Sequence, residues 1–557
     1  MRKFRDRRPS SPLFHAVLLA VLGSCAGASP SSARSMKYAD LISLFADWRQ
    51  FQKPRLVDGV PDYTPAAMAA QHRALAGYQQ RLAAIDPRDW PVAQQADYHA
   101  VRAEMNGLDF DHRVLRPWER NPAFYVSVVA DESDQPAREG PFASGTVELW
   151  RWRLPPPAQQ AAELAEQLAP IPGLLRQARG NLTGNARDLW SYGIRSIEDQ
   201  RELLMDLRDK AGGHPVLAAA ARRALEATEE FVLWLKAQAP AKTGPSGIGV
   251  ENYDWYLANV QLLPYTWVDE VTLAQRELAR ATAALALEEQ HNRALPTQAP
   301  VASVEEHQRR FSAAVTEYMA FLAQRDILTV RPYMDGALRS HLGQYTAARP
   351  LEFFVEVDDR DPVLMRTHSH HWIELARMQH EPHPSPIRRG ALLYNIFDSR
   401  SEGFATAMEE LMMKAGLCDS RPRSRELVYI LLAQRAARAL GELRMHANEL
   451  SLEEAARFAS DHTPRGWLRL DGRTVWFEQH LYLQQPGYGT SYLLGKLEID
   501  ELLSARARQL GSAFTLRQAI DEIDASGLIP VSLVRWELTG ESGHVPGVGW
   551  PATWQRR

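Results

Sequence analysis

The chain has 557 residues, of which 45% are hydrophobic and 24% charged. These fractions are typical of globular proteins, and the length suffices for one large domain or two to three ordinary ones. The formal net charge is −4, and no basic run is interleaved with aromatic side chains. The sequence therefore argues against a nucleic-acid partner.

The first 28 residues have the composition of an export signal. A basic head at residues 2–8 precedes an apolar run, Leu13–Leu22, which is about half the roughly 20 residues needed to span a bilayer. Small residues follow, so we expect a signal peptide rather than an anchor. Two cleavage patterns remain open: Ala26–Ala28 suits ordinary signal peptidase, and Leu22–Cys25 suits a lipobox. We expect a periplasmic protein or one anchored to the outer membrane, with membrane contact only through a lipid on Cys25.

Beyond residue 35 the pattern is helical over long stretches. Five stretches have the apolar spacing or the composition of helices: 158–179, 215–239, 268–289, 304–323 and 426–450. Ser451 with Glu454, and Thr515 with Gln518, have the spacing of capping boxes. Each pair predicts that a further helix begins there.

Strand patterns are few. Phe353–Val357 is a short β-prone run, and Trp467–Phe477 has Asp471 and Gly472 at its centre, a pair typical of hairpin turns. No segment is long or polar enough to be a free linker. We therefore predict one mainly α domain over residues 29–557, with minor β-hairpin content. Its N-terminal helical half would be 36–245, and its C-terminal half, 246–540, would contain the site.

The most unusual local composition lies at residues 366–374, Arg-Thr-His-Ser-His-His-Trp-Ile-Glu. On a helix, Glu374 would share a face with His370, four residues before it, or with His371, three before it. Imidazole and carboxylate at this spacing can hold a divalent metal ion such as zinc. Glu402 is the candidate for a third ligand, although a glutamate in a first helical turn can instead answer the helix dipole. The usual zinc-protease signature HExxH is absent from the sequence.

From Glu402 onward the order of motifs resembles domain-of-unknown-function family 885, a bacterial and often exported group related to gluzincin-type zinc peptidases. Residues 402–409, Glu-Gly-Phe-Ala-Thr-Ala-Met-Glu, are similar to the family's EGWALYAE segment, and Arg438 lies eight residues before His446 as in the family. Other positions are similar to its ExxRYxxxPGQAxxYxxG segment and to its FxL and GxxP ending: Glu478, Tyr482, Pro486, Gly487, Tyr492, Gly495, Phe514, Leu516, Gly527 and Pro530. The resemblance covers residues 36 to 540. It implies a large gluzincin-like helical body around a central cleft.

The family's signature, HExxPGHHxQ, is only half present. Its double histidine falls on His370 and His371, but its leading His-Glu pair falls on Leu364 and Met365, which can neither bind zinc nor transfer a proton. The resemblance thus implies metal ligands at His370 or His371 and at Glu402, without the family's general base. Two sets of residues remain as candidates for the other roles. For proton transfer or a rearranged metal shell they are Glu374, His368 and His380, and for the cleft and its oxyanion they are His446, Tyr482 and Tyr492.

Three functions are open at this point. The first is a zinc-dependent hydrolase that acts on a peptide or amide bond. The second is a metal-dependent lyase, isomerase or non-peptide hydrolase, in which Arg366, Arg388 and Arg389 hold a small anionic substrate. The third is a pseudo-peptidase that serves as a binding protein.

Overall fold

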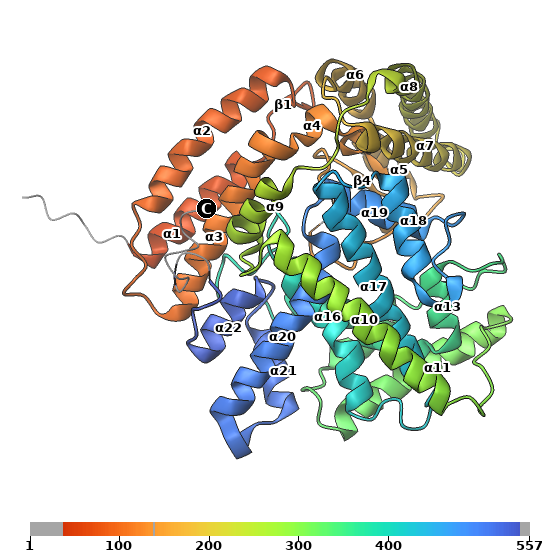
Figure 1. The fold of residues 1–557 in the computed structure, drawn as a ribbon. Coiled ribbons are helices and arrows are strands. Elements are labelled where there is room, and N and C mark those ends of the chain that lie inside the picture. The colour runs from red at the N-terminus through yellow and green to blue at the C-terminus, as the bar shows by residue number, and fades with distance from the viewer. Residues whose placement is uncertain (1–36, 138–139, 546–547, 549–557) are drawn as a thin grey trace, which may run out of the picture.

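Helices form nearly all the regular structure of the residues that the computed structural model describes, 37–137, 140–545 and 548 (Figure 1). Within these ranges the strand pairs are the antiparallel β1 (Leu56–Val57) with β2 (Val60–Pro61) and the parallel β3 (Val128–Val129) with β4 (Val147–Glu148). The prediction of a mainly α fold is confirmed. The predicted signal peptide and Cys25 lie outside the described residues. No helix in the described part of the chain has both the length and the apolar composition to cross a bilayer.

The helices follow one another with short connections. Those of the N-terminal half are α1 (Tyr38–Phe51), α2 (Pro65–Ala83), α3 (Val92–Phe110), α4 (Pro117–Arg120), α5 (Ala158–Leu168), α6 (Ile171–Asn181), α7 (Arg187–Asp209) and α8 (Pro215–Gln238). Next come α9 (Val250–Tyr256), α10 (Trp267–His291), α11 (Val304–Gln324), α12 (Pro332–Arg339), α13 (Phe353–Arg360), α14 (Pro362–His368) and α15 (His370–His380). The last are α16 (Asp398–Lys414), α17 (Ser424–His446), α18 (Leu452–His462), α19 (Thr474–Gln484), α20 (Tyr488–Leu510), α21 (Leu516–Ala525) and α22 (Val531–Thr539). Short π segments, η1 (Asp111–Leu115) and η5 (Leu257–Gln261), and 3-10 turns complete the set: η2 (Pro122–Tyr125), η3 (Leu149–Arg151), η4 (Ala239–Ala241), η6 (Pro464–Gly466) and η7 (Gly511–Ala513).

Most predicted helices are present with small shifts of their ends, as α8, α10, α11 and α17. Ser451 forms the predicted capping box with Glu454 at the start of α18, and the Thr515 side chain caps α21. The stretch 158–179 is instead two helices, α5 and α6. Pro170 lies between them, and a proline there removes a backbone donor and clashes with the preceding turn.

Both strand predictions are wrong. Phe353–Val357 lies in α13, where Phe353 and Val357, four residues apart, are both fully buried on one face. Trp467–Phe477 forms a turn that leads into α19 rather than a hairpin. The Glu352 carboxylate accepts hydrogen bonds from the backbone N–H groups of Arg473 (3.0 Å) and Thr474 (3.2 Å). This distant residue thus caps α19, which the local sequence could not reveal.

Helix α17 lies at the centre of the molecule beside α10 (Figure 1), and nearly all of its residues are buried. Helices α16 and α20 pack against each other at very close range. A Cβ atom placed on Gly403 of α16 would stand 2.3 Å from the Cα atom of Gly495 of α20. Because only glycine lacks a Cβ atom, this pair permits the contact. The contact brings Glu402 next to the tyrosines that begin α20.

One hydrophobic core joins the two ends of the chain. Side chains of α1 and α3, such as Leu41 and Leu108, belong to the same buried cluster as Phe404 of α16 and Val534 of α22. A second cluster involves only residues between 63 and 235. The C-terminal helices are therefore held against the start of the chain by apolar packing, while α5 to α8 have a core of their own.

Candidate metal centre and cavity

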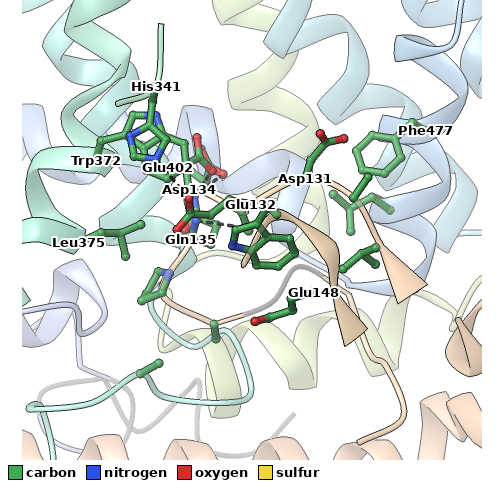
Figure 2. A pocket seen from close by; sticks show the side chains of 18 of the residues that line it. Asp131, Glu132, Asp134, Gln135, Glu148, His341, Trp372, Leu375, Glu402 and Phe477 are labelled. Atoms are coloured by element: carbon green, nitrogen blue, oxygen red, sulfur yellow. Dashed lines mark hydrogen bonds and ion pairs between the residues drawn. The ribbon is translucent and has the colours of Figure 1, made fainter. Parts of the chain in front are cut away.

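A cavity of about 1950 Å³ is bordered by the segment that follows β3 and by helices α7, α12, α15, α16, α17, α19 and α20. Figure 2 shows Asp134 and Gln135 of that segment reaching the cavity beside Glu402, with Asp131 standing apart, nearer to Phe477. Its walls combine aromatic rings with charged groups, the usual make-up of a small-molecule or peptide site.

His368 and Glu402 line this cavity, and the buried His371 lies beside them. Each offers one ligand atom, and these atoms all lie within 4.8 Å of one another. His368 ends α14, His371 lies in the first turn of α15, and Glu402 lies in the first turns of α16. The break between α14 and α15 at Ser369 lets both imidazoles face α16. Three protein ligands with a fourth side open to a cavity are typical of catalytic zinc sites.

In both His371 and Glu402, one polar side-chain atom contacts other residues and the second does not. His371 Nδ1 lies 3.2 Å from Ser401 Oγ. Glu402 Oε1 accepts hydrogen bonds from Gln135 Nε2 (2.9 Å) and from the Tyr488 hydroxyl (2.5 Å). The remaining atoms, His371 Nε2 and Glu402 Oε2, are 3.3 Å apart, and neither has a hydrogen-bond partner among the described residues. Apart from this contact with each other, both buried atoms lack partners, and a bound ion would satisfy both of them.

The geometry fits a divalent ion. Two ligand atoms bound at about 2.0–2.1 Å to one tetrahedral zinc ion are roughly 3.3 Å apart, which is the separation of His371 Nε2 from Glu402 Oε2. His368 Nδ1 lies 3.1 Å from Glu409 Oε1 and 3.3 Å from an Arg435 nitrogen, so its Nε2 atom remains for an ion. A carboxylate behind the imidazole is the usual outer partner of a metal-bound histidine.

Burial and neighbouring charges set the protonation of this group. Burial opposes a charge on His371, but the carboxylates of Asp134, Glu402 and Glu374 outweigh it and raise the pKa of His371 to about 9. Burial likewise raises the pKa of Glu402, yet the His371 charge lowers it to about 2. The pKa of His368 is lowered by burial and by Arg435. Without an ion, His371 and Glu402 thus form an ion pair, and metal binding would displace the proton on His371.

The other two predicted ligands, His370 and Glu374, face away from this group. His370 Nε2 lies 3.2 Å from an Asp524 oxygen, and Glu374 lies 2.5 Å from Arg400, which is also 3.3 Å from Asp524. Consecutive helical residues point about 100° apart, so His370 and His371 cannot share a face. The structure therefore brings His371 and Glu402 together with His368. It places His370 and Glu374 with Asp524 in a second, buried group of possible ligands. The carboxylates of that group pair with Arg400 and Arg377.

The three arginines predicted to hold an anion do not line the cavity. Arg366 pairs with Asp358 at 2.9 Å, and Arg388 pairs with Asp97 at 2.6 Å. The Arg389 side chain is exposed, with its nearest acceptors the carbonyl oxygens of residues 383 and 384. All three lie in structural contacts rather than at the candidate site.

Two of the three predicted cleft residues line the cavity. These are Tyr482 and Tyr492, whereas His446 is fully buried outside it. His446 Nε2 lies 3.0 Å from the Tyr482 carbonyl oxygen, so this histidine orders the end of α19. His380 lines the cavity at the end of α15, where its ring stacks on Tyr333.

Sequence reasoning missed several cavity residues. Asp134 and Gln135 follow β3 in a segment without periodicity or motif, so no local signal marks them. Arg435 and Arg438 line the cavity from α17. Arg438 belongs to a family-like motif and Arg435 precedes it by three residues, hence on the same helix face. That spacing could have identified both as cleft residues.

A family model described as "Bacterial protein of unknown function (DUF885)" matches residues 370–538. The resemblance to family 885 is confirmed. The match begins at His370, so it leaves out Leu364, Met365 and His368, where this chain departs from the signature of family 885. No curated protein matches the chain.

Two solved structures are similar over almost their whole length. One is named "putative lipoprotein of unknown function" and comes from Shewanella oneidensis; it is 16% identical, has a TM-score of 0.66, and the similarity covers 91% of this chain and 100% of that one. The other is named "putative lipoprotein" and comes from Colwellia psychrerythraea. It is 14% identical and has a TM-score of 0.66, and the similarity covers 91% of this chain and 99% of that one. At this identity the likeness establishes a shared fold.

Proposed function

We propose that this protein is a metal-dependent hydrolase of a peptide or amide bond, with His368, His371 and Glu402 as ligands of a divalent ion, zinc in the first instance. The observation that carries the proposal is the 3.3 Å separation of His371 Nε2 from Glu402 Oε2, two buried ligand atoms without other partners. The outer contacts from Ser401, Glu409 and Gln135 fix the remaining atoms, as ligands of a metal require.

His368 compensates for the ligand that the family signature would put at Leu364. Both positions lie in α14, four residues apart and thus one helical turn from each other. Moving the imidazole by one turn keeps it on the same helix and brings it to the end that meets His371. The presence of His368 favours a metal site with a rearranged set of ligands over a site that has lost its metal, since a pseudo-peptidase has no need of a second imidazole.

A divalent ion held there would polarise the substrate carbonyl and make water more acidic. The chain supplies a carboxylate to take the proton of the attacking water, Asp134. Its charge acts on His371, and it lines the cavity. It does not belong to the group of ligand atoms within 4.8 Å of one another. That position suits a general base, which acts on water rather than on the ion.

Tyrosine hydroxyls of the cavity wall are the proposed donors to the developing oxyanion. Burial raises the pKa of Tyr482 well above its usual value, so the hydroxyl keeps its proton. Tyr492 lines the same wall, and its ring lies parallel to that of His368 with centroids 6.4 Å apart. Donors set beside the ligand group stabilise negative charge that forms on a carbonyl oxygen.

Export to the periplasm or anchoring to the outer membrane is part of the proposal. It is supported by the signal-like residues 1–28 and by the names of both structural neighbours, which include the word lipoprotein. Acylation at Cys25 would leave a metal-dependent hydrolase facing the envelope. Mass spectrometry of the membrane fraction tests this, because an unmodified chain starting at residue 29 would exclude the anchor.

Metal analysis of three purified proteins tests the proposal as a whole. We expect one equivalent of zinc per chain after loading and dialysis, its loss in His371→Ala, and its retention in His370→Ala, the neighbouring histidine that faces Asp524 instead. Folding of each variant is checked by circular dichroism. Zinc retained by His371→Ala, or none in the wild type, would refute the site, and intact amide bonds across a peptide panel would refute the reaction.

A further inference from the structure

Arg438 of α17 presents unpaired N–H groups to the cavity. Its side chain is about 99% buried and lines the cavity wall. Nη1 donates to Glu478, a carboxylate that also accepts from Gln434 Nε2 at 3.1 Å. Nε and Nη2 have no partner among the described residues. A buried guanidinium with two unused donors is an unsatisfied binding group.

Aromatic rings of the cavity wall surround the Arg438 guanidinium. Its Cζ atom lies 4.2 Å from the ring centroid of Tyr492, 5.6 Å from that of Tyr482 and 5.9 Å from that of Phe354. All three rings line the cavity. The guanidinium is therefore surrounded by aromatic side chains that also line the cavity.

Arg435, one turn earlier, differs in this respect. Its two Nη atoms bind both oxygens of Glu409 at 2.6 and 2.7 Å. The Glu409 carboxylate thus pairs with both Nη atoms of Arg435 and neutralises the charge of the guanidinium. Arg438, held at one nitrogen only, has a free pair of adjacent N–H groups in the planar arrangement that matches a carboxylate.

The free donors of Arg438 lie close to the proposed ligand group. The Tyr492 ring contacts the Arg438 guanidinium and also stacks near His368. Tyr488, whose hydroxyl binds Glu402, lies edge-on to the same ring with centroids 5.8 Å apart. One aromatic ring thus separates an anion-binding group from the candidate metal ligands.

We propose that Arg438 binds the free carboxylate of the substrate, so that the bond cleaved is the amide bond next to that carboxylate. The substrate class is therefore the C-terminal residue of a short peptide, or an N-acyl amino acid. In the reaction, water adds to the carbonyl carbon, the C–N bond breaks, and the nitrogen of the released amino acid takes up the proton that water loses. The inference rests on the proposed hydrolase function for its chemistry, but not for its binding step.

The charges elsewhere on the cavity wall agree with this orientation. Asp131 and Asp134, which follow β3 on a different segment from Arg438, line the cavity. Their negative charge disfavours a carboxylate at that wall and favours the amino-terminal part of a peptide. The substrate carboxylate is thus directed to Arg438 by attraction at one side and repulsion at the other.

The test compares N-acetylated dipeptides with their C-terminal amides, on zinc-loaded protein. We expect the wild type to prefer the free acids by about 100-fold in kcat/KM, mainly through KM, because the amide leaves the guanidinium unpaired. Arg438→Gln should lose this factor on the acids and leave the amides unchanged. Arg473→Gln, which alters an exposed cavity arginine paired with Asp199, is the matched control and should keep the preference.

Calorimetric binding of the same acids and amides provides a readout that does not need turnover, and Arg438→Lys serves if the Gln variant does not fold. Equal binding of acids and amides by the wild type, or equal losses on both in the variants, would overturn the inference; the second result would mean an oxyanion role. If the acids bind in an Arg438-dependent way and no peptide is cleaved, the carboxylate site stands and the hydrolase proposal fails.

Discussion

The backbones of Gly403 in α16 and Gly495 in α20 are in direct contact. A Cβ atom on Gly495 would stand 2.0 Å from the Ser399 carbonyl oxygen and 2.7 Å from the Gly403 Cα atom. No rotamer can relieve an overlap between a Cβ atom and backbone. The two helices can therefore come this close only because both positions are glycine. Their close approach also brings the Tyr488 hydroxyl within hydrogen-bonding distance of Glu402.

Gly495→Ala should destabilise the protein by about 3 kcal/mol, the upper part of the range for an overpacked core. Urea unfolding followed by circular dichroism measures the change. The matched control is Gly77→Ala in α2, where an added Cβ atom meets nothing within 4 Å; better helix propensity should make it more stable by about 1 kcal/mol. Equal effects of the two substitutions would contradict the close approach of α16 and α20.

His368→Gln should weaken zinc binding by at least about 100-fold, because it removes one of three protein ligands and costs more than the loss of an outer contact. Competition with a chromophoric chelator measures the affinity. His380→Gln, an exposed histidine at the other end of α15, should bind zinc as the wild type does. Unchanged affinity in the His368 variant would leave only His371 and Glu402, too few ligands for a zinc centre.

Asp134→Asn should lower kcat by about 10²- to 10⁴-fold, the range for loss of a general base, while zinc remains bound. Asp131→Asn is the matched control: it removes a carboxylate from the same segment and cavity, and should retain most of the activity. Activity and zinc content are measured on the same samples. Loss of zinc together with activity in Asp134→Asn would instead make Asp134 a ligand.

The pH dependence of stability should carry a contribution from Glu442. Burial raises the pKa of this carboxyl group to about 8, although backbone N–H groups of α20 oppose the shift. Because the unfolded chain loses this proton near its usual pKa of about 4.3, the folded state binds one proton more between that value and about 8. The free energy of unfolding therefore falls as pH rises through this window, by at most about 1.4 kcal/mol per pH unit from this group.

Comparison of the wild type with Glu442→Gln at pH 5.5 and 7.5 isolates that contribution. The amide does not titrate, so the variant should lose less stability between the two pH values. Urea unfolding at each pH supplies the four free energies. An identical difference in both proteins would mean that Glu442 is ionised in the folded state throughout.

The sequence predicted most of the helices because apolar spacing and capping residues act locally. It failed where tertiary contacts decide, as at α19, whose first turn is capped by Glu352 from more than a hundred residues away. The β-prone run at Phe353 became helical because Phe353 and Val357 could bury one face together. Single strands of this kind have no partner strand to stabilise them.

For the candidate site, the sequence named His371 and Glu402 among its possible ligands but could not decide which face of the histidine helix points toward Glu402. His370 and Glu374 have the same local spacing, and tertiary contacts place them beside Asp524 and Arg400 rather than at the cavity. The sequence likewise did not predict that Arg366 pairs with Asp358 or that Arg388 pairs with Asp97. Ionic partners far apart along the chain leave no periodic pattern.

One hydrogen bond joins the candidate site to the N-terminal half of the chain. Glu402 is oriented by the Gln135 side chain, which lies 267 positions earlier in the sequence and comes from the other half of the chain. A C-terminal fragment expressed alone would lose this contact and keep the second one, in which the Tyr488 hydroxyl donates to the same oxygen. The orientation of the Glu402 carboxylate therefore depends in part on a contact between two segments far apart in the chain.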